Sequence, residues 1–386
     1  MRVVLDINGI TETSGGLGNY IRLLVSNLAA IDAENEYLLY LHQWKSPDPA
    51  ALDRVLPKQA NFKLVFRRVP NTLSLFAEYK WGIGLTDVLL KGGPKTVFHG
   101  PSNVVPRLGT MKSLVSIHHY MPTTDPVLFP KKMDARSRFY FGLTDAVARQ
   151  ADRIVVVSKT TGNHLVERLG ISREKVSVVY PGGPHPVYRR IEEPLPSPLA
   201  EKLQGPYILF PGPLNERKNL PGFLEAFASV QNQLEGYRIA VTSTPSESFA
   251  ATIAATVEKF SLSGKVVFLG EVSDADMAAL YSHAACLAYP SFFEGFGSPP
   301  LEAMACGCPV MASNLTAIPE ITAGAALLFD PADKASMSQA LLRIVREEAL
   351  RRDLIARGFE RVKNFSWRRM AQEIHGIYGE MAGDRS

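Results

Sequence analysis

The stretch ACLAYPSFFEGFGSPPLEAMACGCPVMAS, residues 285–313, carries the pattern that decides the fold. An apolar run, ACLAYPS, is followed by a glycine-rich loop, by a segment that begins SPPLE, and by a second apolar run, PVMAS. Ser298 is a typical N-cap residue, Pro299 suits the first turn of a helix, and Gly307 suits its end. The stretch therefore predicts a strand, a helix over about 298–306, and a second strand.

The same alternation of apolar runs and helical patterns occurs in two series along the chain. Continuous apolar runs are typical of parallel strands that are buried on both faces. The first series of expected strands comprises Arg2–Ile7, Tyr37–His42, Lys63–Val69, Thr96–Gly100, Ser113–His119 and Arg153–Ser158. The second comprises Tyr207–Gly212, Arg238–Ser243, Lys265–Gly270, Ala285–Ser291, Pro309–Ser313 and Ala325–Asp330. The sequence thus predicts an α/β protein with two doubly wound, Rossmann-like domains.

A proline-rich segment marks the expected boundary between these domains. The 386 residues of the chain are too many for one ordinary core. Residues 191–206, IEEPLPSPLAEKLQGP, contain four prolines, which interrupt helices and central strands. We therefore expect an N-terminal domain over 1–190, a linker over 191–206 and a C-terminal domain over 207–364. Residues 365–386 are expected to form a final helix, because their pattern is amphipathic and Ser366 is suited to be its N-cap.

Composition and charge exclude several classes of protein. The net charge of +4 is too small for a nucleic-acid footprint, and three cysteines exclude a disulfide framework. The chain shows no signal-peptide pattern and no long uncharged apolar stretch, so we expect a cytoplasmic protein without a membrane-spanning helix. Basic clusters at Phe62–Arg68, Lys131–Arg138 and Tyr188–Arg190 are either solvated surface or points of attraction to an anionic membrane.

Two loops with anion-binding character follow expected strands. In doubly wound sheets, ligands bind at the carboxyl ends of the strands. The segment Thr13–Tyr20, TSGGLGNY, precedes a helix, and its Gly16 belongs either to an anion site or to a tightly packed turn. Arg217 and Lys218, in NERKNL, are suited to neutralise a diphosphate, or else lie in a solvated basic loop.

The glycine-rich loop of residues 294–297 and the expected helix after it each carry one carboxylate. Glu294 lies in the loop and Glu302 lies eight positions later, in the expected helix. The N–H groups of Gly297 and Ser298 are free at the start of that helix, and the carboxylates are suited to accept hydrogen bonds from ligand hydroxyl groups. A helix-dipole glutamate and an exposed loop glutamate would be the ordinary alternative. That alternative accounts for neither the glycines nor the apolar flanks.

Histidines end two expected strands of the first domain. His99 ends one strand, and His118 with His119 ends the next. A histidine in such a position either has a structural role or forms hydrogen bonds and transfers protons in a site. His118 is the stronger candidate because its loop is expected to lie at the ligand-binding edge.

Together these segments resemble the retaining glycosyltransferases of family 4, which have the GT-B fold. The resemblance spans nearly the whole chain and is most specific in the E-x7-E spacing of Glu294 and Glu302. The segments GGLGNY, VFHGPSNVVP, SLVSIHHYMP, ADRIVVVSKTT, VSVVYPGG, ERKNL and FLGEVS match in the same order along the chain. The resemblance implies two Rossmann-like domains that face each other across a cleft, with the last helix crossing back to the N-terminal domain.

The resemblance also implies roles for individual residues. Glu294 would hold sugar hydroxyl groups, Glu302 would hold the ribose, and His118 would position the donor and help to stabilise positive charge at the anomeric carbon. The other residues that would contact the donor are Gly16, Arg217, Lys218, Gly270, Val272, Phe296, Gly297 and Ser298. Relatives often carry arginine where this chain has Pro213, which leaves the two basic side chains with more of the phosphate charge.

The implied activity is a metal-independent hexose transfer that retains the anomeric configuration. The acceptor hydroxyl group would attack from the leaving-group face, and the departing diphosphate would take its proton. The type of N-terminal sequence favours mannose from GDP-mannose, with UDP-linked sugars as alternative donors and no separate cofactor. The acceptor would be a glycan or a lipid-diphosphate-linked sugar at the inner membrane face, in polysaccharide or lipopolysaccharide synthesis. A nucleotide-sugar epimerase of the same fold and a non-catalytic nucleotide-sugar sensor are the other interpretations.

Overall fold

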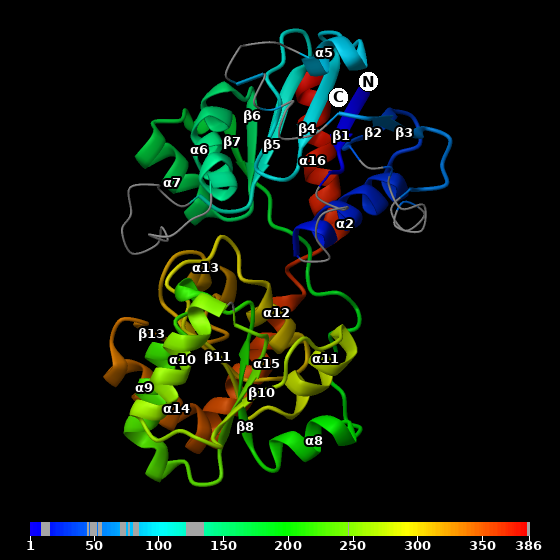
Figure 1. The fold of residues 1–386 in the computed structure, drawn as a ribbon. Coiled ribbons are helices and arrows are strands. Elements are labelled where there is room, and N and C mark those ends of the chain that lie inside the picture. Colours follow the sequence, from blue (N-terminus) through cyan, green and yellow to red (C-terminus); the bar gives the residue numbers. More distant parts are fainter. Residues whose placement is uncertain are drawn as a thin grey trace. The chain divides into compact units, whose positions relative to one another are not determined.

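The chain forms two compact units, each built around one parallel sheet (Figure 1). The computed structural model describes residues 1–8, 16–44, 46, 52, 56–69, 75, 78–79, 85–120, 135–245 and 247–383. Unit 1 comprises Met1–Gly182 and Ser366–Ser386, and unit 2 comprises Gly183–Phe365. The proline-rich segment 191–206 lies inside unit 2, where it contains helix α8 (Ser197–Leu203) with two buried leucines.

The sheet of unit 1 has, among the described residues, seven strands in the order β3-β2-β1-β4-β5-β6-β7. They are β1 (Arg2–Asp6), β2 (Glu36–His42), β3 (Phe62–Arg67), β4 (Thr96–Gly100), β5 (Lys112–Ile117), β6 (Arg153–Val156) and β7 (Val176–Val178). The first six confirm the predicted strands of the N-terminal series. The short β7 is absent from that series because its three residues are only half-buried and give no long apolar run.

Helices cover both faces of this sheet. They are α2 (Gly16–Ile31), α5 (Leu85–Leu90), α6 (Ala135–Gln150), α7 (Lys159–Leu169) and α16 (Trp367–Ala382), with a 3-10 turn η1 (Arg173–Lys175). Val3 and Leu5 of β1 share one core with α2 and α16, whereas Val4 shares another core with α6 and α7. Alternate side chains of one strand thus serve two cores, which is why the run is apolar at every position.

The sheet of unit 2 has, in the described part of the chain, six parallel strands in the order β10-β9-β8-β11-β12-β13. They are β8 (Tyr207–Pro211), β9 (Arg238–Thr242), β10 (Val266–Phe268), β11 (Cys286–Tyr289), β12 (Val310–Ser313) and β13 (Leu327–Phe329). The remaining helical elements are η2 (Glu216–Lys218), α9 (Leu220–Val230), η3 (Gln231–Gln233), α10 (Glu247–Lys259), α11 (Asp274–His283), α12 (Ser298–Ala305), α13 (Ile318–Thr322), α14 (Lys334–Arg346) and α15 (Glu348–Val362). Every strand predicted in the second series is present, so two Rossmann-like sheets are confirmed.

Helix α12, which follows the glycine-rich loop after β11, begins differently from the prediction. The N-cap residue is Gly297, at φ 102°, and Ser298 is the first helical residue rather than the cap. The positive φ favours glycine at this position, because side chains of L-amino acids rarely adopt it, and a β-carbon there would also press on the Cδ1 atom of Ile318 at 2.7 Å. Gly307, at φ 72°, follows the end of the helix as predicted.

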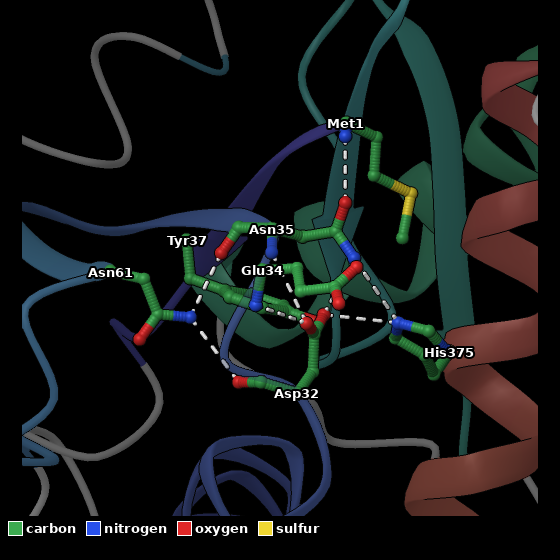
Figure 2. A network of polar contacts seen from close by, with 7 residues as sticks. All are labelled: Met1, Asp32, Glu34, Asn35, Tyr37, Asn61 and His375. Carbon is green, nitrogen blue, oxygen red and sulfur yellow. Dashed lines mark hydrogen bonds and ion pairs between the residues drawn. The ribbon is translucent and has the colours of Figure 1, made fainter.

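The final helix, α16, belongs to unit 1 and packs beside α2 (Figure 1). Its predicted N-cap is confirmed, since the side chain of Ser366 accepts a hydrogen bond from the backbone N–H of Arg369. Figure 2 shows a second attachment, in which one oxygen of Asp32 accepts hydrogen bonds from Tyr37 at 2.7 Å and from His375 of α16 at 3.0 Å. Within the described ranges, no helix combines the length and apolar character needed to cross a membrane.

Candidate functional site

The candidate site of unit 2 lies where the order of its strands reverses. That reversal falls between β8 and β11, and the loops after these two strands carry the predicted residues. The backbone N–H of Phe292, after β11, donates to the backbone oxygen of Arg217, after β8, over 2.9 Å. The two loops are therefore joined at the point where doubly wound sheets bind their ligands.

Glu294 is the centre of a buried ion cluster. Its Oε1 atom lies 2.8 Å from the Nζ atom of Lys218 and 2.6 Å from the Nη1 atom of Arg217. Lys218 also donates to the hydroxyl group of Tyr289 over 2.7 Å, and the backbone N–H of Glu294 donates to Thr316 over 2.9 Å. Glu294 is 8% exposed and Lys218 is 4% exposed. The structure thus brings together three of the predicted site residues, which are up to 77 positions apart in the sequence (294 − 217).

The charges of this cluster determine its pKa values. Burial by itself would raise the pKa of Glu294, but Lys218 and Arg217 outweigh it and lower that pKa to about 2. Burial lowers the pKa of Lys218 in spite of Glu294, whereas Glu294 raises the pKa of Arg217 in spite of burial. The carboxylate is therefore ionised at neutral pH.

Both cations keep hydrogen-bond donors that this cluster does not use. An ammonium group has three donors, and Lys218 uses one for Tyr289 and one for Glu294. Arg217 uses its Nη1 atom for Glu294 and for the backbone oxygen of Phe293, and no described residue accepts a hydrogen bond from its Nε or Nη2 atoms. Arg217 is partly exposed, with 25% of its side chain accessible. These unused donors are suited to oxygen atoms of an anion.

Glu302 occupies the next part of the site, on α12. It is half-buried, and its Oε2 atom accepts a hydrogen bond from the hydroxyl group of Tyr281 over 3.2 Å. Burial raises the pKa of Glu302 to about 7, while Tyr281 and the charge of Lys218 act in the opposite direction. The charge of Lys218 thus acts on both Glu294 and Glu302.

The remaining predicted residues of unit 2 lie in two segments, one directly after Glu294 and one between β10 and α11. Phe296 is buried and packs edge-to-face with Phe365, with ring centroids 5.7 Å apart. The N–H groups of Gly297 and Ser298, at the start of α12, have no hydrogen-bond acceptor among the described residues. Gly270, at φ 77°, and Val272 lie between β10 and α11, and no hydrogen bond or ion pair joins their loop to the ion cluster in the described part of the chain.

In unit 1, His118 follows β5 and has a defined tautomer. Its Nε2 atom lies 2.7 Å from the backbone oxygen of Pro101, which only accepts hydrogen bonds, so Nε2 carries the hydrogen. Its backbone N–H donates to the side chain of Asn103 over 2.7 Å, and its ring meets that of Tyr20 edge-on at 4.5 Å. Burial lowers the pKa of His118, so the ring is neutral at neutral pH and its Nδ1 atom is an acceptor.

The contacts of His99 support a structural role and not a role in a site. Its ring nitrogens lie 2.6 Å from the hydroxyl group of Tyr378 and 2.8 Å from that of Ser116. Burial lowers the pKa of His99 to about 3, so it is neutral and fully paired inside the core. Gly16 is the first residue of α2, and the rest of the glycine loop before it lies outside the described residues.

Tyr281 and Tyr289 are site residues that the sequence analysis missed. Tyr289 lies in an apolar strand and Tyr281 in an apolar helix segment, so both patterns indicate core residues. The usable signal was chemical, because buried tyrosine hydroxyl groups require a hydrogen-bond partner. Among the described residues, no group of His, Cys, Asp or Glu side chains is arranged as metal ligands.

The basic segment Phe62–Arg68 is largely the edge strand β3. Lys63 forms an ion pair with Glu36 over 2.9 Å, and Arg67 donates to the backbone oxygen of Phe66 over 3.0 Å. The side chains of these two cations therefore already have partners within unit 1. Residues 131–134 of the second basic cluster lie outside the described residues.

Comparison with known protein families matches both halves of the chain. Residues 14–183 match the model described as Glycosyltransferase Family 4, and residues 192–361 match the model described as Glycosyl transferases group 1. O-antigen chain mannosyltransferase B of Escherichia coli is 29% identical over 293 residues, which cover 73% of this chain and 74% of that protein.

Solved structures with the same two-domain architecture cover nearly all of the chain. Sucrose-phosphate synthase from Thermosynechococcus elongatus matches with a TM-score of 0.76 and 22% identity over 100% of both chains. The Anabaena protein Alr3699/HepE, solved in complex with UDP-glucose, matches with a TM-score of 0.71 and 15% identity over 98% of this chain and 100% of that one. At these identities the likeness shows the fold, which is the GT-B architecture.

Proposed function

The chain belongs to the family 4 glycosyltransferases, and from this premise we propose that it transfers a hexose from a nucleotide diphosphate sugar to a hydroxyl group of a glycan or lipid-linked acceptor. The likeness to an O-antigen mannosyltransferase supports a role in cell-surface polysaccharide or lipopolysaccharide synthesis. It also supports mannose as the sugar. GDP-mannose as the donor rests on the type of N-terminal sequence alone. The observation that carries the proposal is the cluster of Arg217, Lys218 and Glu294 at the reversal of strand order in unit 2.

The N–H groups that this cluster does not use are assigned to the diphosphate of the nucleotide sugar. Arg217 offers its Nε and Nη2 groups, and Lys218 offers its third N–H group. The free backbone N–H groups of Gly297 and Ser298 add the partial positive charge of a helix N-terminus. The negative charge of Glu294 offsets the repulsion between the two cations. Glu302 is assigned to the ribose hydroxyl groups.

His118 is assigned to the hexose in its neutral form. Because Nε2 is committed to Pro101, the Nδ1 atom is the one that can accept a hydrogen bond from a sugar hydroxyl group. A neutral ring adds no positive charge near an anomeric carbon that becomes positive in the transition state.

The transfer itself follows a front-face course in this proposal. The bond from the anomeric carbon to the phosphate oxygen breaks, and the bond to the acceptor oxygen forms on the same face. The hydroxyl proton of the acceptor passes to the departing diphosphate, so no protein base is required. Charge that develops on the diphosphate is met by Arg217, Lys218 and the helix N-terminus.

A screen of nucleotides and donors tests the proposed function. We expect one of GDP, UDP, ADP and dTDP to raise the melting temperature well above the others, because a ligand at a hundred times its Kd adds about 2.7 kcal/mol to the stability of the folded state. The matching nucleotide sugar should release nucleoside diphosphate when acceptor is added. Conversion of the donor alone into an isomer would indicate an epimerase, and binding without turnover would indicate a sensor. Absence of binding by all four nucleotides would contradict the proposal.

The stereochemistry and the metal requirement are tested on the same reaction. We expect the product to keep the anomeric configuration of the donor, as measured by NMR of the anomeric C–H group. Turnover should be unchanged in EDTA, because protein cations meet the charge of the diphosphate. An inverted product, or loss of activity in EDTA that Mg²⁺ restores, would contradict the proposed course.

A further inference from the structure

The carboxylate of Glu302 is held from one side only. The hydroxyl group of Tyr281 donates to its Oε2 atom over 3.2 Å, and no other described residue donates a hydrogen bond to Glu302. Tyr281 lies on α11 and is fully buried, whereas Glu302 lies on α12 and is half-buried. A rigid donor from a neighbouring helix thus fixes one carboxylate oxygen and leaves Oε1 unoccupied.

Tyr281 is itself fixed by the segment that opens unit 2. The ring of Tyr188 meets that of Tyr281 edge-on, with centroids 6.1 Å apart. The hydroxyl group of Tyr188 donates to Asp274, at the start of α11, over 2.9 Å. Tyr281 is therefore packed within its helix and braced by a second aromatic residue, so its hydroxyl group has little freedom to leave the carboxylate.

We propose that Tyr281 is a positioning residue for Glu302, which orients the carboxylate so that Oε1 accepts the hydrogen bonds of a ribose 2′,3′-diol. This inference rests on the proposed function, because it assigns Glu302 to the ribose of a nucleotide. A carboxylate has two oxygens, and a diol is recognised best when the carboxyl group cannot rotate. Tyr281 supplies that constraint without touching the ligand.

Tyr281→Phe tests the proposal, with Tyr207→Phe as the matched control. Both tyrosines are buried in unit 2, and the hydroxyl group of Tyr207 donates over 2.7 Å to the backbone oxygen of Leu280, next to Tyr281. The control therefore loses one buried hydrogen bond in the same region but leaves the carboxylate untouched. The probes are GDP, UDP and their 2′,3′-dideoxy forms, with Kd measured by calorimetry.

We expect Tyr281→Phe to weaken binding of the better ribonucleotide about tenfold while it changes the Kd of the dideoxy form little. Tyr207→Phe should keep the wild-type preference for ribose. In a Glu302→Ala background, Tyr281→Phe should have no further effect, because the acceptor through which Tyr281 acts is then absent. Equal losses for ribose and dideoxy forms, or additive losses in the double variant, would overturn the positioning role. Failure of wild type to bind any nucleotide would overturn the proposed function as well.

A pH series supplies a second readout that general loss of stability does not produce. The hydrogen bond from Tyr281 opposes the effect of burial on Glu302, so its removal raises the pKa of Glu302 above its wild-type value of about 7 and leaves less of the carboxyl group ionised at pH 7 than in wild type. The titratable groups that influence or are influenced by Glu302 lie on several elements and are Tyr188, Lys218, Asp274, Tyr281, Tyr289 and Cys306. We expect ribonucleotide binding by Tyr281→Phe to recover between pH 7 and pH 9. A deficit that is constant across this range would contradict the assignment.

Discussion

At the scale of single residues, the candidate site depends on how one carboxylate compensates two cations. Lys218 is almost fully buried, and Glu294 lies 2.8 Å from it. A buried ammonium group without such a partner would lose its proton or destabilise the fold. In the proposed function the same pair prepares a phosphate site, because Glu294 holds the cations in place before any ligand arrives.

Glu294→Gln should lower the free energy of unfolding by about 3 kcal/mol at pH 7, since it leaves buried cations without a counter-charge. The pKa of Glu294 is lowered from 4.5 to about 2 in the folded protein, so its stabilising effect is complete above pH 4.5 and disappears as the pH falls towards 2. Urea unfolding of both proteins from pH 7 to pH 2 measures this change. Glu235→Gln, at an exposed position of the same unit, is the control. A difference that does not shrink in acid would show that charge is not its origin.

The sequence could identify these residues but not their pairing. Glu294, Arg217 and Lys218 stand out because charged residues follow apolar strands. Their contact depends on β8 and β11 being neighbours in the sheet, which no local pattern encodes. Tyr281 was missed for the same reason, since its role depends on the packing of α11 beside α12.

At the scale of elements, unit 1 is held together by a chain of buried polar side chains. Tyr378 of α16 bonds to His99 of β4, His99 bonds to Ser116 of β5, and Ser116 lies 3.3 Å from the hydroxyl group of Tyr20 of α2. All four residues are at most 3% exposed. The ring of Tyr20 then meets His118, so the final helix and the candidate catalytic histidine share one network.

Tyr378→Phe should destabilise unit 1 by about 1–3 kcal/mol, because it leaves a buried nitrogen of His99 without a partner. The midpoint of urea-induced unfolding measures the effect. Tyr237→Phe is the control, since Tyr237 is only partly buried against the core of unit 2. Equal stability of the two variants would show that this series of buried hydrogen bonds contributes nothing to the stability of unit 1.

The polar network of Figure 2 attaches α16 at a second point. Burial would raise the pKa of Asp32, but hydrogen bonds from Tyr37, Asn35 and the backbone outweigh it and hold that pKa below 3.8. Asp32→Asn should therefore speed hydrogen exchange in residues 367–382 at pH 7, and the difference from wild type should fade as the pH drops below 3.8. Glu34→Gln, two positions along on the surface, should leave exchange unchanged. Unchanged exchange in Asp32→Asn would contradict the attachment.

Most elements could be predicted because their signals are local. Twelve apolar runs matched twelve strands, and the cap residue of α16 was visible in the sequence. The errors lie where tertiary contacts decide. Ser298 has the chemistry of an N-cap, yet Gly297 takes that position with a left-handed backbone conformation at φ 102°, which suits glycine and which no local pattern announces.

At the scale of the whole molecule, the two units carry different parts of the proposed reaction. Unit 2 holds the ion cluster and Glu302, which are assigned to the donor nucleotide. Unit 1 holds His118 in a neutral form that suits a sugar hydroxyl group.

Hydrogen exchange with and without nucleotide tests the central claim, that unit 2 binds the donor through its ion cluster and α12. With GDP or UDP at saturating concentration, we predict slower exchange in residues 212–220, 270–273 and 294–306. The protection should be lost in Lys218→Met, a variant of similar length without the charge. Protection confined to unit 1, or saturable binding without protection of these three segments, would contradict the account.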